Sequence, residues 1–230
     1  MLNLIRLEMA KNNAAKYSLY AVIAILCLTA LSMAFVFLLG ADDPESAAGM
    51  LGVSLFVETM TSIVFLIITA VMHSAFTVNA YKNRTMDLMF SYPIDRRKIL
   101  ASKILAVLVF NFVWLIIAQV IIYGSIYIAS NYLQPSIQID FDISNITFYF
   151  SVVLKSVSTI CVSLIALFVG MISKSPTATI VAAFFLVTLL KGNIGGYSLA
   201  GSVIFPVFLT LISIIFTFLT INGVERKDVV

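Results

Sequence analysis

The chain contains long apolar runs that carry almost no charge, and these runs restrict its fold more than any other feature. Residues Tyr17–Leu39 contain no Asp, Glu, Lys or Arg. About 20 mostly apolar residues in a helix are enough to cross the hydrocarbon core of a bilayer. Charged residues make up 11% of the chain, against about 25% in soluble domains. A soluble core of this size would still need a charged shell, so the sequence predicts a membrane protein.

Five further segments repeat this pattern, which predicts an all-α membrane protein with six transmembrane helices. After Tyr17–Leu39 we expect spans at Val57–Val78, Ile104–Ala129, Val152–Ile172, Thr177–Leu190 and Leu199–Asn222. The fifth span is short, and it crosses only if Lys191 reaches to the interface. The glycine-rich segment 192–198 that follows it fits either a shallow re-entrant turn or an ordinary outer loop.

The positions of Lys and Arg predict the orientation of these helices. In a six-helix arrangement, twelve of the fourteen basic residues fall on one side, and Lys155 and Lys191 fall on the other. The first and third loops contain acidic residues and no Lys or Arg. Because basic residues concentrate in cytoplasmic loops, we expect both termini in the cytoplasm.

The expected domains are an N-terminal interfacial helix (1–16), a transmembrane domain (17–222) with a cytoplasmic loop (79–103), and a cytoplasmic tail (223–230). The first apolar run is longer than the core of a signal peptide, about 7–15 residues, which favours a retained helix.

The second cytoplasmic loop, 79–103, holds a short apolar segment next to basic residues. Thr85 can cap a short helix over Met86–Phe90, and Tyr92 should end it because it precedes Pro93. A new helix should start after Pro93 and continue into the third span. An apolar helix outside the bilayer needs a surface to cover it, either the lipid interface or a groove on a partner. The neighbouring positive charges alone are explained by anchoring at acidic lipid headgroups.

This loop resembles the coupling loop of permease subunits of ABC-2 type transporters. The similarity covers Thr85-Met86-Asp87-Leu88-Met89-Phe90-Ser91-Tyr92-Pro93-Ile94-Asp95-Arg96-Arg97-Lys98. Arg84-Thr85 stands where the family usually has Gly-Thr, and the glutamate that many members have just upstream is missing. The six-helix plan and the basic N-terminal arm extend the resemblance over the whole chain.

The resemblance implies that the short helix docks in a groove of a separate ATP-binding subunit. The residues expected to form this coupling site are Thr85, Met86, Leu88, Met89, Phe90, Tyr92, Pro93, Arg96 and Arg97. The chain has no G-x-x-x-x-G-K-[S/T] phosphate loop, so we expect this chain to bind no cofactor. ATP and Mg are expected to bind to the ATPase subunit, which should be present in two copies. Six helices are half the usual complement, which implies a second permease copy, in a homodimer or a heterodimer with a paralogue. The expected location is a bacterial plasma membrane, with lipid as a neighbour and no nucleic acid as a partner.

Polar residues recur on one side of the second expected helix. If successive residues are 100° apart around the helix axis, about one third of the circumference of this helix contains the polar residues Glu58, Ser62, Thr69, His73 and Thr77. Such a stripe should face protein or water. Because this helix lines the central cavity in the resembling family, the resemblance implies a translocation path, to which Thr188 of the fifth helix could add. The alternative is that the hydroxyls bond within their own helix and that Glu58 marks the outer interface. On the fourth helix, a stripe of mostly small residues from Lys155 to Gly170 favours helix packing over transport.

The leading hypothesis is therefore the membrane subunit of an ATP-driven exporter. The closest resemblance is to Gram-positive permeases that expel antimicrobial or amphipathic peptides, including toxins of the phenol-soluble-modulin type. The alternatives are an exporter of lipid or hydrophobic drugs, and a secondary transporter or channel without an ATPase. A secondary transporter usually needs ionisable groups near the middle of the membrane, and the few in the spans lie toward the ends of the expected helices. The chain has one histidine and two cysteines, both in apolar runs, so no metal or catalytic site is expected.

Overall fold

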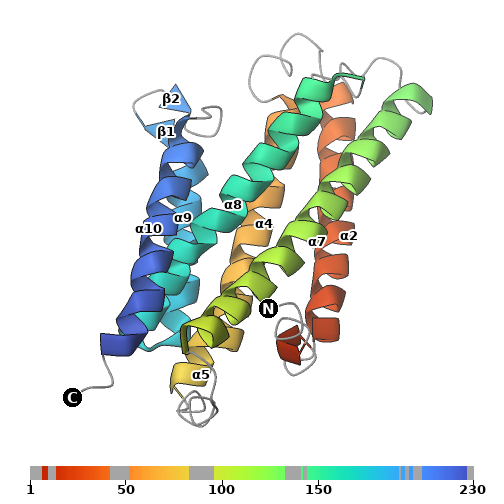
Figure 1. Cartoon of the computed structure of the whole chain (residues 1–230). Coiled ribbons are helices and arrows are strands. Elements are labelled where there is room, and N and C mark those ends of the chain that lie inside the picture. Colours follow the sequence, from red (N-terminus) through yellow and green to blue (C-terminus); the bar gives the residue numbers. More distant parts are fainter. Residues whose placement is uncertain are drawn as a thin grey trace.

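In the part of the chain that the computed structural model describes, six long helices pack side by side (Figure 1). The structure describes residues 7–9, 14–41, 52–82, 96–132, 141, 144–191, 193–194, 197–198 and 204–226. The long helices are α2 (Ala14–Ala41), α4 (Val53–His73), α7 (Arg96–Tyr132), α8 (Ile146–Ser173), α9 (Pro176–Lys191) and α10 (Ile204–Arg226). A π-helical segment, η1 (Ser74–Val78), and the short α5 (Asn79–Lys82) continue α4. Each of the six expected spans thus overlaps one of these helices.

Four of these helices are long and apolar enough to cross a membrane. Within the described residues the candidate spans are Ala14–Phe37, Val53–Val78, Arg97–Asn131 and Ile146–Ser173. Shorter apolar helices cover Pro176–Leu190 and Val207–Thr220. The structure therefore supports a membrane-embedded helical protein, and six complete crossings stay a prediction.

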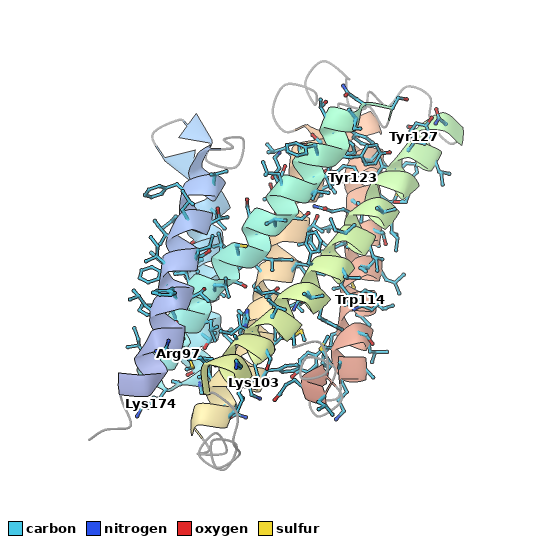
Figure 2. All side chains as sticks on the ribbon, in the orientation of Figure 1. Arg97, Lys103, Trp114, Tyr123, Tyr127 and Lys174 are labelled. Atoms are coloured by element: carbon cyan, nitrogen blue, oxygen red, sulfur yellow. The ribbon has the colours of Figure 1, made fainter. Side chains whose placement is uncertain are left out.

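The helices alternate in direction, and the basic residues gather at one end of the bundle. Arg97, Lys103 and Lys174 lie at this end, which we call the basic end, and Tyr123 and Tyr127 lie at the opposite end (Figure 2). The start of α2 and the last turn of α10 also lie at the basic end (Figure 1). The positive-inside rule assigns the basic end to the cytoplasm. The start of α2 and the last turn of α10 lie at this same end, as the expected orientation requires.

Two of the clusters that make up the core lie between α4 and α7 and between α4, α8 and α9. In the first, Phe65 packs with Leu115 and Ile122. In the second, Leu66 and Ala70 of α4 pack against Val162 and Ala166 of α8 and against buried residues of α9. Large apolar side chains on the outer faces of α2, α9 and α10 are exposed, as expected where lipid surrounds a bundle.

The turn between α8 and α9 brings two helices unusually close. A Cβ built on Gly170 would lie 1.9 Å from Oγ1 of Thr179 and 3.2 Å from Cγ2 of Val78. Lys174 ends α8 in the left-handed conformation (φ 48°), and its amide donates to the carbonyl of Gly170. Thr159, Ser163, Ala166 and Gly170 of the small-residue stripe of α8 are buried, in agreement with the packing role expected from the sequence, whereas Lys155 at its outer end is partly exposed.

A small hairpin follows α9. Asn193–Ile194 (β1) pairs antiparallel with Tyr197–Ser198 (β2). It lies at the end of the α9–α10 pair, opposite the basic end (Figure 1). This position favours the outer turn, of the two arrangements considered for 192–198, because the strands do not fold back between the helices.

Candidate functional site

The expected coupling segment lies largely outside the described residues. Thr85, Met86, Leu88, Met89, Phe90, Tyr92 and Pro93 belong to residues 83–95, which the structure does not describe. Arg96 is the first residue of α7, and the side chain of Arg97 is exposed at the basic end (Figure 2). As expected for a helix that starts after Pro93, α7 runs unbroken from Arg96 to Tyr132.

A buried ion pair ties the start of α7 to the N-terminal segment. Nζ of Lys103 lies 2.7 Å from Oε2 of Glu8, and the two side chains are 2% and 11% exposed. By its position in the sequence, Lys103 belongs to the basic residues of the expected cytoplasmic loop (79–103). The structure instead buries its side chain, because Glu8 compensates its charge. The pair links residues 95 positions apart, and no pattern in the sequence signals it.

The polar stripe of α4 is directed into the bundle, and its members have different surroundings. The hydroxyls of Ser62 and Thr69 donate to the carbonyl oxygens of Glu58 and Phe65, one turn earlier. Thr69 and His73 are completely buried. These contacts match the alternative interpretation of the stripe, in which the hydroxyls form hydrogen bonds within their own helix. They satisfy the hydroxyls but do not test a role in transport.

Glu58 belongs to an ion pair between α4 and α8. Nζ of Lys155 lies 2.5 Å from Oε2 of Glu58. Lys155 was one of two basic residues on the side opposite the main positive cluster, and its pairing with a carboxylate explains how it is accommodated there. Close to this pair, the hydroxyl of Ser156 lies 2.8 Å from Oε1 of Gln119 on α7. Polar contacts thus join α4, α7 and α8 at the end opposite the basic residues.

His73 lies where α4 changes into the π-helical segment η1. The residue is completely buried, and neither ring nitrogen has a hydrogen-bond partner in the described part of the chain. The hydroxyl of Thr77, inside η1, is also buried without a partner there. One turn of π-helix widens a helix locally and is frequent at functional sites. The hydroxyl of Ser74 donates to the carbonyl of Pro176 across 3.0 Å, which ties η1 to α9.

Thr188 lies on the exposed side of α9. Its hydroxyl donates to the carbonyl of Phe185. Ala183, Leu186 and Leu190 pack toward α4 on the other side of the helix. The structure therefore does not bring Thr188 together with the polar stripe of α4 inside one subunit. Among the described residues, no three His, Cys, Asp or Glu side chains are close enough to hold a metal ion.

The comparisons with known proteins identify the family. A family model described as ABC-2 family transporter protein matches residues 4–191. The chain belongs to the ABC-2 transporter family. It is also 26% identical to the uncharacterized protein YcbO of Bacillus subtilis over 233 residues, covering 99% of this chain and 100% of that relative. No solved structure matches the chain significantly.

Membership of this family gives the chain a place in a larger assembly. A permease of the ABC-2 family is a membrane subunit that works with an ABC ATPase subunit. The apolar helices of the structure agree with this location. The bacterial relative agrees with a bacterial origin.

Proposed function

We propose that the chain is the permease subunit of an ATP-driven ABC-2 exporter of amphipathic or antimicrobial peptides. Two copies of an ATPase would close on ATP and Mg and push on the segment around Met86–Phe90. A second permease copy would complete the transmembrane pathway. The observation that carries this proposal is the family match over most of the chain, together with the continuity of α7 from that segment into the membrane.

The Glu8–Lys103 ion pair supports a mechanical role for the start of α7. It joins the N-terminal segment to α7 only seven residues after the helix begins. Breaking a buried pair leaves an uncompensated charge, which is strongly unfavourable. The N-terminal segment and α7 would therefore move together when the ATPase pushes on the loop.

The substrate class rests on the expected pathway and on the family resemblance. An apolar path with scattered hydroxyls along α4 suits an amphipathic helix, which presents both kinds of surface. A lipid or a hydrophobic drug would meet the same surfaces, and a transport assay with each class of compound distinguishes them. The loops have no segment large enough for a capture domain, which favours export over import. Family membership argues against the remaining alternative, a secondary transporter or channel without an ATPase.

The coupling segment can be tested by charge insertion. We expect Met89→Asp and Phe90→Asp to remain folded in the membrane but to lose co-purification with the ATPase, because a carboxylate cannot be desolvated in an apolar groove without a large cost. Ala15→Asp is the matched control, since it adds the same charge at the exposed start of α2 and favours that helix terminus. The proposal fails if both loop variants retain the ATPase and support full substrate-stimulated ATP hydrolysis.

A further inference from the structure

A polar cavity lies within the single subunit, at the end of the bundle opposite the basic residues. Its volume is about 530 Å³, within the range of small-molecule sites. The walls come from the first turns of α4, the outer half of α7 and the first turns of α8, with Phe141 from the preceding segment. Because the basic end belongs in the cytoplasm, this cavity belongs at the outer face of the membrane.

The charged wall of the cavity is the Glu58–Lys155 ion pair. Lys155 remains 29% exposed and Glu58 12% exposed, although both reside on apolar helices. A pair that serves only to join two helices is best covered by protein, because the membrane is a poor solvent for charge. Here the pair faces a space large enough for a ligand. A ligand that brings charges of both signs could exchange partners with it and leave no charge uncompensated.

Gln119 adds a second polar group to the same cavity. The Ser156 hydroxyl has one proton, yet it lies within 2.8 Å of Oε1 of Gln119 and within 2.6 Å of the Val152 carbonyl. Whichever way the Gln119 amide is turned, one of its two polar atoms is left without a hydrogen bond among the described residues. That atom can bond to a ligand.

Three aromatic rings form the opposite wall. The ring centroid of Tyr123 lies 5.0 Å from those of Phe141 and Phe148, which are 5.5 Å from each other. Aromatic faces attract ammonium groups. Beyond the cavity, Phe150, Val153 and Val157 are exposed on the same turns of α8, and they offer an apolar surface at the same depth for acyl chains.

We propose that this cavity binds the zwitterionic headgroup of an amphiphile that carries a primary ammonium and a phosphate. The phosphate contacts Lys155, and the ammonium contacts Glu58 and the rings of Tyr123, Phe141 and Phe148. Because the cavity lies at the outer membrane surface next to exposed apolar residues, a phosphatidylethanolamine lipid is the favoured ligand. Free phosphoethanolamine has the same ammonium and phosphate groups but no acyl chains, and its phosphate monoester carries up to one more negative charge than the lipid's diester. This site does not depend on the transported substrate, so it stands or fails separately from the exporter proposal.

Lipid retention tests the proposal on the full chain. The purified protein is equilibrated in nanodiscs of equal phosphatidylethanolamine and phosphatidylglycerol, released into mild detergent, and its bound lipids are counted by native mass spectrometry. We expect retention of phosphatidylethanolamine over phosphatidylglycerol by about tenfold, since only phosphatidylethanolamine brings an ammonium group to Glu58 and one charged hydrogen bond is worth about that factor. The double variant Glu58→Gln/Lys155→Gln, which conserves net charge, should abolish this preference.

Two further variants separate binding from folding. Ser151→Leu narrows the cavity but leaves the ion pair in place, and it should lower retention of phosphatidylethanolamine by a similar factor. Lys174→Gln removes one positive charge from the other end of α8, and it should retain the lipid as the unchanged protein does. Equal retention of the two lipids by the unchanged protein, or undiminished preference in both cavity variants, would overturn the proposal.

A soluble competitor identifies the source of the headgroup. If millimolar phosphoethanolamine displaces the retained lipid, the headgroup charges alone are sufficient for binding. If the lipid stays bound while phosphoethanolamine has no effect, the acyl chains are also needed and the ligand is a membrane lipid. If neither phosphatidylethanolamine nor phosphoethanolamine binds to the protein, the proposed site is contradicted.

Discussion

The two ends of the bundle each contain an ion pair between distant segments, and the two pairs have different surroundings. At the basic end, Lys103 and Glu8 are almost completely enclosed by protein. At the opposite end, Lys155 and Glu58 border a cavity of about 530 Å³. Both pairs are short, so distance does not distinguish them. The lysines do, because Lys103 is 2% and Lys155 29% exposed, whereas the Glu8 and Glu58 carboxylates are 11% and 12% exposed.

This difference indicates different roles for chemically similar pairs. An enclosed pair resists separation, because protein leaves little room for water to replace either partner. A pair that borders a polar space can open when water or a ligand replaces the partner. The packing of the two ends agrees with this distinction. Near the basic end Gly170 leaves no room for a methyl group, whereas Gly124 in the outer half of α7 has nothing within 4 Å.

Separating the enclosed pair should have the largest effect on stability. Lys103→Met removes the cation that lies 2.7 Å from the largely buried Glu8, and we expect it to lower the free energy of unfolding by about 3–5 kcal/mol. The measurement is SDS-titrated unfolding of the purified protein. The double variant Glu8→Gln/Lys103→Met removes both charges and should recover most of the loss. A cost of under about 1 kcal/mol for the single variant, as at an exposed pair, would show that the two ends do not differ.

A methyl group should distinguish the packing of the two ends. Gly170→Ala forces α8 away from Thr179, and we expect destabilisation by about 1–3 kcal/mol, the usual cost of overpacking. Gly124→Ala is the matched control, because its methyl group meets no neighbour and alanine favours a helix by up to about 1 kcal/mol. The apparent melting temperature of each variant in detergent gives the comparison. Equal shifts for the two variants would contradict a tightly packed basic end.

Separating the accessible pair should have the smallest effect. Lys155→Gln should change the free energy of unfolding by no more than about 1 kcal/mol, because the remaining Glu58 carboxylate borders the cavity, where water can solvate it. Raising NaCl from about 0.05 to about 0.5 M should shrink the Glu58–Lys155 coupling energy in a double-mutant cycle. The Glu8–Lys103 coupling energy should barely change, since salt does not reach that pair. A coupling energy at Glu58–Lys155 that salt leaves unchanged would mean that the cavity is closed to solvent.

The sequence was a good guide to the positions of the helices and a poorer guide to their ends. The expected fourth span began at Val152, but α8 begins at Ile146 because Asn145 caps it, with its side chain accepting from the amide of Thr147. The capping signal was present in the sequence. A search for apolar runs misses it, because helices continue into the polar interface beyond the hydrocarbon core.

The candidate site was predicted less completely than the fold. The polar stripe of α4 was expected to face protein or water, and its side chains are directed into the bundle. Its connection to Lys155 was not expected, since the two residues were assigned separately to helix ends. The coupling residues stay a prediction, because all of 83–95 lies outside the part of the chain that the structure describes.

The sequence by itself determined that this protein is a helical membrane protein with one basic end. Apolar runs of the length of a bilayer must satisfy their backbone groups internally, and that requirement leaves helices as the solution. Only the tertiary structure decided which charges meet. Glu8 and Lys103 are 95 residues apart, and Glu58 and Lys155 are 97 apart. Pairing over such distances depends on how the helices pack, because local spacing places a side chain on a face of its own helix and does not choose the neighbour that the face meets.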